Sequence, residues 1–224
     1  QGINPSKMIV DELIFNSRRL VLDAFALKKI KAKLFTGLNV KYIDYSNLKT
    51  DSTHVYYPEL VGASNFGIGY SVLKDTRNSL LTPSKGAYFY CNTTYNFSRS
   101  NYWELTLDVR YYKTWKDKFT LATRLINDFN LGTPPFYDFA FLGGDKFVRG
   151  YYFGRYRDNN LSSLQSEFRF PIVWRLGLST FGGLSILYSK TNNLRLSNAK
   201  YNCGLGIRFN VDKKDRTNLR LDYA

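Results

Sequence analysis

Residues 102–115 constrain the fold more than any other stretch, because apolar and polar side chains alternate there almost from end to end. A period of two places successive side chains on opposite faces of a β-strand. Lys113 is the one exception, and it lies near an end, where its stem can extend to an interface. The stretch therefore predicts a long amphipathic strand. Its apolar face comprises Trp103, Leu105, Leu107, Val109, Tyr111 and Trp115, and its polar face comprises Glu104, Thr106, Asp108, Arg110, Tyr112 and Thr114.

The same alternation recurs along the chain and is clearest again at 200–211. Most of these segments run to about 10–14 residues, against a usual strand length of about 5 or 6 in soluble proteins. A content of 17% aromatic and 22% charged residues also favours strands over helices. About ten strands are predicted, at 19–28, 32–45, 65–73, 87–98, 102–115, 119–130, 161–172, 177–189, 200–211 and 217–224.

Alternation alone also fits a soluble sandwich, so strand length and the position of the aromatic residues decide between the two classes. Trp103 and Trp115 lie at the ends of one apolar face, as in the aromatic girdles of membrane barrels. Each charge on the polar face of 102–115 would cost about 2–4 kcal/mol if it met the middle of a bilayer. The polar face must therefore line the inside. We predict an all-β fold, an antiparallel transmembrane β-barrel of the outer membrane, over a soluble lectin-like or lipocalin-like binder.

The connections between the expected strands alternate in length. Bacterial outer-membrane barrels have short periplasmic turns and longer extracellular loops, so the alternation gives the chain an orientation. It has two exceptions, because 74–86 is longer and 98–101 is shorter than the pattern predicts. The short connections are 28–31, 116–118, 173–176 and 212–216, and the long ones are 46–64, 131–160 and 189–199.

No linker or change in composition divides the chain, so we expect residues 1–224 to form one transmembrane barrel domain. An open sheet edge cannot persist in lipid, because its backbone groups would lack hydrogen-bond partners. The tenth expected strand runs to Ala224, where the sequence stops. We therefore expect at least one further strand and a barrel that is incomplete at its C-terminus, and the N-terminus is open to the same interpretation.

The connection at 131–160 is the strongest candidate for a functional segment. Long ordered loops in tightly connected chains usually carry function, and the glycine and aromatic content of this one argues against disorder. Its centre contains Gly143-Gly144 followed by Val148-Arg149-Gly150-Tyr151. The orientation derived from loop lengths puts this loop on the extracellular side.

Four motifs, taken in order, resemble those of one family. The loop motif just described resembles that of the BamA/TamA/FhaC outer-membrane assembly and translocation superfamily, the bacterial surface antigen family. The resemblance implies a protein of the Gram-negative outer membrane, with these ten strands as the sixth to fifteenth of sixteen; a total of twelve is the alternative. The other three motifs are Asp75-x-Arg77 with Pro83-x-x-Gly86 in a turn, Gln165-x-Glu167-x-Arg169-x-Pro171 in the strand after the loop, and Leu219-Arg220-Leu221-Asp222-Tyr223-Ala224 near the end.

In that family the loop folds back into the lumen and its arginine pairs with acids on the inner wall, which makes Arg149 the residue concerned here. The alternation independently puts Glu167 and Asp222 on polar faces. They are the candidate partners of Arg149, because a partly desolvated arginine needs a carboxylate. One departure is that the family often places an acid in a Phe-x-Asp-x-Gly strand, whereas this sequence has Phe181-Gly182-Gly183. We expect the usual contact to be weaker or to use a different acid.

The resemblance implies a barrel that inserts or assembles outer-membrane proteins, or translocates proteins across the outer membrane, without covalent chemistry. The implied partners are outer-membrane lipid and lipopolysaccharide, client outer-membrane or secreted proteins, and periplasmic accessory proteins. The family barrel also occurs fused to periplasmic enzymes such as patatin-like lipases. The alternative is therefore a barrel that serves as an anchor or pore for such a domain and has no insertase activity.

The sequence offers no convincing enzyme, metal or cofactor site. His54 is the only histidine, and the cysteines, Cys91 and Cys203, lie far apart without metal-ligand spacing. The best candidate for a membrane helix, Leu20–Leu27, is too short and contains Asp23, so a helical membrane protein is excluded. The basic residues behind the net charge of +14 are scattered, so nucleic acid is not an expected partner. A solvated interior and loops explain the charge best, with anionic lipid head groups as the main alternative.

Overall fold

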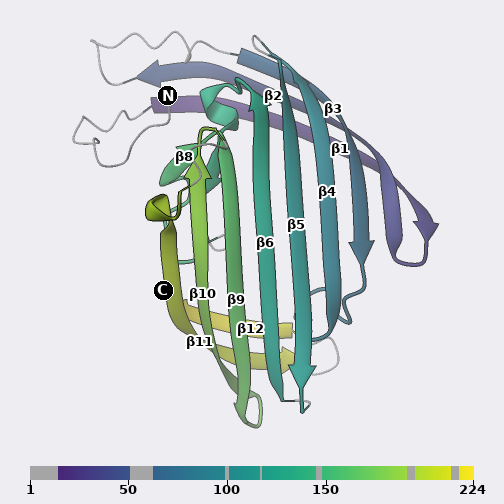
Figure 1. The fold of residues 1–224 in the computed structure, drawn as a ribbon, viewed down its shortest axis with the longest axis vertical. Helices are drawn as coiled ribbons and strands as arrows, with labels where there is room; N and C mark the ends of the chain where they lie inside the picture. Colours follow the sequence, from purple (N-terminus) through teal and green to yellow (C-terminus); the bar gives the residue numbers. More distant parts are fainter. Residues whose placement is uncertain are drawn as a thin grey trace.

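The computed structural model describes residues 15–50, 63–98, 101–116, 118–144, 148–190, 195–212 and 217–224. Ten long strands in these residues form one antiparallel sheet (Figure 1). Two short strands, β7 (Ala140–Leu142) and β8 (Tyr156–Asp158), pair with each other outside this sheet. The long strands are β1 (Phe15–Lys31), β2 (Leu34–Thr50), β3 (Ala63–Asp75), β4 (Gly86–Phe97), β5 (Tyr102–Trp115), β6 (Phe119–Gly132), β9 (Asn160–Val173), β10 (Leu176–Tyr188), β11 (Lys200–Asp212) and β12 (Thr217–Tyr223).

Each long strand pairs with the next one in sequence, and β6 pairs with β9 across the segment that holds β7 and β8. The sheet curls strongly, so that β12 passes behind β9 in the view of Figure 1. Among the described residues, β1 and β12 are the edges of this sheet. No helix in these residues is long and apolar enough to cross a membrane. The ten predicted strands are confirmed, each within a few residues of its expected bounds.

The register fixes which side chains share a face of the sheet. Directly paired residues point the same way, so Glu104 shares a face with Thr94 and Asn130. Thr94 is fully buried and Asn130 is 7% exposed, whereas Trp103 and Leu205 on the other face are 47% and 66% exposed. Polar side chains are thus buried and large apolar ones exposed, the reverse of a soluble protein. A membrane barrel requires this inversion, because its outer face meets lipid. We call the two sides the polar face and the apolar face.

The first hairpin differs from the prediction. The sequence predicts its turn at 28–31, but β1 continues through Lys31 and the chain reverses at residues 32 and 33. Lys33 has a positive φ of 64°, a left-handed backbone conformation of the kind found in tight hairpin connections. Lysines suggested a turn because they are charged, yet their long stems allow them to remain in a strand at the end of a membrane barrel.

The connection after β2 is also shorter than the predicted 46–64, because β2 reaches Thr50 and β3 begins at Ala63. Polar residues therefore continue the strand beyond its apolar part, where the sheet extends past the lipid. His54 lies in 51–62, outside the described residues.

Candidate functional site

The connection at 131–160 contains a small hairpin of β7 and β8, which the alternation does not predict because the strands are only three residues long. A single 3₁₀ turn, Phe136–Asp138, precedes it. Gly143, directly after β7, has a φ of +115°, and a Cβ there would lie 2.0 Å from the carbonyl oxygen of Tyr152. A side chain cannot be accommodated in that space, so this position requires glycine.

A buried apolar cluster fixes the backbone beside Arg149. Val148 and Leu142 are fully buried and pack with Leu161 of β9. The backbone NH of Val148 also donates to the carbonyl oxygen of Gly144 at 3.1 Å. Burial of aliphatic side chains of this size contributes about 1.5–3 kcal/mol each. Arg149 therefore extends toward the sheet from a well-anchored position.

The guanidinium of Arg149 contacts three strands of the sheet. Its Nη2 donates to Oε2 of Glu167 in β9 at 2.6 Å, and its Nη1 donates to Oδ2 of Asp222 in β12 at 2.8 Å. The guanidinium carbon lies 3.7 Å from the ring centroid of Phe181 in β10, a cation–π contact. The side chains of the three charged residues are only 11–14% exposed. The structure thus brings Arg149 together with both carboxylates named from the sequence.

Two further arginines complete an ionic network around these carboxylates. Oε1 of Glu167 accepts hydrogen bonds from Arg169 Nε at 2.9 Å and from Arg208 Nη2 at 3.2 Å. Arg208 also donates to Oδ1 of Asp222, so every carboxylate oxygen in the group has an arginine donor. We call Arg149, Glu167, Arg169, Arg208 and Asp222 the arginine network. The group holds three cations and two anions, so removing either acid leaves poorly exposed arginines uncompensated, which costs about 3–5 kcal/mol.

This geometry accounts for the departure at Phe181-Gly182-Gly183. A Cβ at Gly183 would lie 2.6 Å from Oδ1 of Asn202, so the side chain of Asn202 occupies the space beside this position. Nδ2 of Asn202 donates to the carbonyl oxygen of Arg149 at 3.1 Å. Arg149 instead contacts two acids of other strands, Glu167 of β9 and Asp222 of β12.

The turn motif lies at the end of β3 and the start of β4. Arg77 donates from Nε and Nη2 to the carboxylate of Asp75 at 2.9 and 2.6 Å. This hydrogen bonding raises the pKa of Arg77 above its ordinary value. Gly86 has a φ of +103°, and a Cβ there would lie 2.3 Å from the carbonyl oxygen of Thr76. Asp75, Arg77 and Gly86 thus stabilise the turn through contacts within it.

The turn motif also reaches the arginine network. The carbonyl oxygen of Pro83 accepts a hydrogen bond from Nη1 of Arg169 at 2.9 Å. The next carbonyl oxygen, that of Ser84, accepts one from Thr114 of β5 at 2.8 Å. Because Arg169 also binds Glu167, the turn and loop motifs are connected through two side chains of β9. The sequence alone does not indicate that the turn motif and the loop motif are connected.

The loop contacts the polar face at a second place, through Asp138. Its Oδ2 accepts hydrogen bonds from the Tyr102 hydroxyl at 2.6 Å and from Asn65 Nδ2 at 2.9 Å. Tyr102 and Asn65 are each 1% exposed and are bonded to one another at 2.8 Å. Nearby, the rings of Tyr45 and Tyr137 have centroids 4.2 Å apart. The loop is therefore attached both to β3 and β5 and, through Arg149, to β9 and β12.

Sequence reasoning did not single out Arg208 or Asp138. Alternation puts Arg208 on the polar face of 200–211, but nothing in the sequence supplies the register that brings it to Asp222. Asp138 belongs to no motif and carries no such signal. In the described part of the chain, no three His, Cys, Asp or Glu side chains are grouped so that they could hold a metal ion.

The curved sheet, its exposed apolar face and the loop bound to its polar face define an outer-membrane β-barrel. The family model of the Omp85 superfamily domain matches residues 27–224. The chain therefore belongs to the Omp85 superfamily, and it is a protein of the Gram-negative outer membrane. Both the predicted fold class and the predicted location are confirmed.

Solved structures of other proteins share this fold, and two of them illustrate the similarity. BamA from Haemophilus ducreyi lacking POTRA domains 1–3 aligns with a TM-score of 0.69 and 12% sequence identity over 93% of this chain. CdiB from Acinetobacter baumannii aligns with a TM-score of 0.61 and 16% identity, also over 93% of this chain. The chain spans 51% of the former and 39% of the latter. Comparison with curated protein sequences gives no match.

Proposed function

We propose that this barrel assembles outer-membrane proteins or translocates proteins across the outer membrane, with Val148-Arg149-Gly150-Tyr151 folded into its lumen. Membership of the Omp85 superfamily supports the activity. The observation that supports the role of the loop is the bonding of Arg149 to Glu167 and Asp222. These acids lie on the polar face, which in a membrane barrel lines the lumen.

In this proposal the loop acts as a brace across the inside of the barrel. Asp138 attaches it to Tyr102 of β5, and Arg149 attaches it to Glu167 of β9 and Asp222 of β12. The brace would keep these strands in register while edge strands pair with a client by β-augmentation. The mechanism needs no covalent step, and its energy comes from backbone pairing and from burial of the client.

Reconstitution of the full-length protein in liposomes tests the proposal. We expect the wild type to accelerate insertion of a barrel client or export of a secreted client. Arg149→Ala should slow this at least about tenfold, the effect of roughly 1.4 kcal/mol. The matched control is Arg124→Ala, since Arg124 also lies on the polar face and binds Asp108 at 2.8 Å.

The outcomes separate the parts of the proposal. An Arg149→Ala protein that folds and keeps full activity would reject the role of the loop while leaving the activity intact. A folded wild type that conducts ions across the liposome membrane but inserts and exports no client would support the anchor or pore instead.

A further inference from the structure

One edge of the sheet is rich in basic residues. Among the described residues, the hairpin turns and neighbouring strand ends at this edge hold 11 basic and 2 acidic residues, a net charge of +9. The described parts of the connections at the opposite edge are longer in total but hold 7 basic and 2 acidic residues, a net charge of +5; they are 45–50, 63–64, 97–98, 101–102, 131–144, 148–160, 188–190 and 195–200. We call the first group the basic edge, and it comprises 28–33, 74–85, 113–116, 118, 173–176 and 212.

Aromatic side chains line the apolar face next to the basic edge. Trp115 stacks on Phe168 of β9 with ring centroids 6.4 Å apart. Trp174, in the turn between β9 and β10, meets Phe209 at 6.0 Å and is 75% exposed. Rings of this kind settle where acyl chains meet head groups. The aromatic belt therefore sets the depth of the membrane at this end of the barrel.

Basic side chains lie directly on these rings. Nζ of Lys113 is 5.3 Å from the centroid of Trp115, and the guanidinium carbon of Arg175 is 5.2 Å from that of Trp174. Lys113 alone interrupts the apolar face of β5, and it is exposed. A cation held on an aromatic ring at this depth lies at the level of lipid phosphates.

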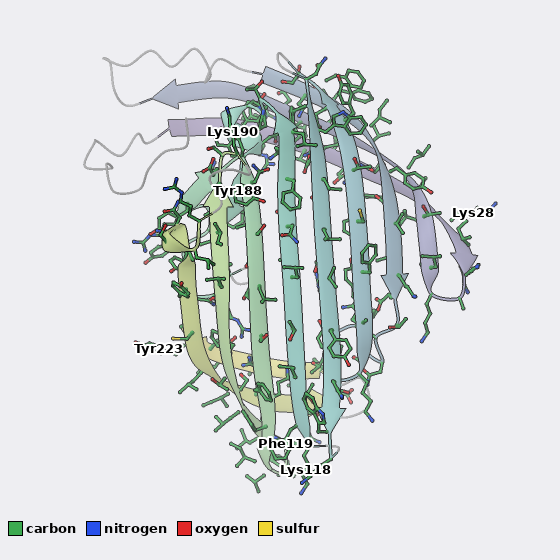
Figure 2. The ribbon with its side chains drawn as sticks, in the orientation of Figure 1. Lys28, Lys118, Phe119, Tyr188, Lys190 and Tyr223 are labelled. Carbon is green, nitrogen blue, oxygen red and sulfur yellow. The ribbon has the colours of Figure 1, made fainter. Side chains whose placement is uncertain are left out.

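Figure 2 shows Lys118 and Phe119 at one end of the sheet and Tyr188 and Lys190 at the other. Lys116 and Lys118 extend the basic group of Lys113 beyond the aromatic belt, and both are exposed. The basic edge thus combines cations inside and just outside the membrane boundary. Solubility alone would not require a lysine on the lipid-facing side of the belt.

We propose that the basic edge is a binding surface for the head groups of anionic phospholipids, such as phosphatidylglycerol, in the leaflet that it meets. Short hairpin turns face the periplasm in outer-membrane barrels, so this leaflet is the inner one. Clustered Lys and Arg side chains at a membrane surface attract anionic lipids. The assignment of this surface does not rest on the arginine network or on the proposed activity. It would hold the barrel at a fixed depth and give it a shell of anionic lipid.

Electron spin resonance of the full-length protein in phosphatidylcholine bilayers tests this proposal. Trace spin-labelled phosphatidylglycerol and spin-labelled phosphatidylcholine are compared for the fraction that the protein immobilises. We expect an association constant at least about threefold higher for phosphatidylglycerol at low salt. The ratio of the two association constants should fall toward one in 1 M salt, where the screening length is about 3 Å. Equal association of the two lipids at low salt overturns the proposal.

A matched pair of variants locates the surface. Lys113→Gln/Lys116→Gln removes two exposed charges from the basic edge, and Lys190→Gln/Arg195→Gln removes two exposed charges from the opposite edge. We expect the first variant to lose at least half of the preference and the second to retain it. Because all four side chains are exposed, both variants should fold, which heat-modifiable gel mobility verifies. An equal loss in both variants would show a general attraction by net charge and would also overturn the assigned surface.

Discussion

Arg149 in the loop and Asp222 in β12 are 73 positions apart in the sequence, and their side chains are joined by a hydrogen bond of 2.8 Å. The same loop is bound at Asp138 by Tyr102 of β5 and Asn65 of β3. A single connection between β6 and β9 therefore joins parts of the sheet that are otherwise related only through several intervening strands. Both attachments use groups that are largely hidden from solvent, where lost partners are costly.

The two acids of the arginine network should differ in their contribution to stability. Glu167 accepts hydrogen bonds from three arginines and Asp222 from two. We expect Glu167→Gln to lower the free energy of unfolding by about 3–5 kcal/mol, because it leaves buried cations uncompensated, and Asp222→Asn to lower it by less. Urea unfolding of the full-length protein in lipid vesicles, followed by tryptophan fluorescence, measures both. The reverse order would contradict the assigned network.

Loss of the second attachment should loosen the start of the loop. Tyr102→Phe removes the hydroxyl that donates to Asp138 and accepts from Asn65, which costs about 1–3 kcal/mol in a buried site. Hydrogen exchange of the amides in 136–142 should become faster. The control is Tyr111→Phe on the apolar face, where the side chain is 50% exposed. If both variants exchange like the wild type, Asp138 does not anchor the loop.

The glycine directly after β7, Gly143, should be irreplaceable. Gly143→Ala would force a methyl group to within 2.0 Å of the Tyr152 carbonyl oxygen at a φ of +115°. A residue held in this backbone region costs about 1–3 kcal/mol before the clash is counted. Gly182→Ala is the control, because its added Cβ would meet only the Asn202 carbonyl oxygen, at 3.5 Å. The temperature at which gel mobility changes should fall for the first variant only.

The link between the loop and turn motifs depends on the shape of arginine. Arg169 reaches Glu167 through Nε and the Pro83 carbonyl oxygen through Nη1. A lysine is a single point donor and cannot reproduce this fork. Arg169→Lys should therefore speed hydrogen exchange in 78–85, while the same change at Arg124 should not. Unchanged exchange in the Arg169 variant would show that the turn is held by its own hydrogen bonds.

Much of the fold could be predicted from side-chain alternation, because a membrane barrel has two chemically opposite faces. Alternation along 102–115 gave that strand its observed bounds, and the same phase put Glu167 and Asp222 on the polar face where Arg149 meets them. Contacts that depend on register or on backbone geometry were not predictable. Arg208 reaches Asp222 only because Gly206 pairs with Asp222 and leaves room between them.

Errors at strand ends have a related cause. The hydrophobic pattern indicates where a strand enters the lipid. It does not indicate where the backbone hydrogen bonding between strands ends. β1 and β2 therefore extend beyond their predicted bounds into charged and polar residues. The short strands β7 and β8 contain too few residues to show a period at all.

The most direct test of the central claim, that the loop lies against the inner wall, is a disulfide between loop and wall that leaves the arginine network intact. A Cβ at Gly150 would lie 3.2 Å from that of Ala224, close to the separation of about 3.5–4.5 Å found in disulfides. The pair Gly150→Cys/Ala224→Cys is introduced into full-length protein lacking Cys91 and Cys203, in native membranes, with Gly150→Ala as the control for folding. We predict that mild oxidation forms the disulfide. Folded protein that forms none, and whose thiol at position 150 reacts with a membrane-impermeant maleimide from outside the cell, would contradict the claim.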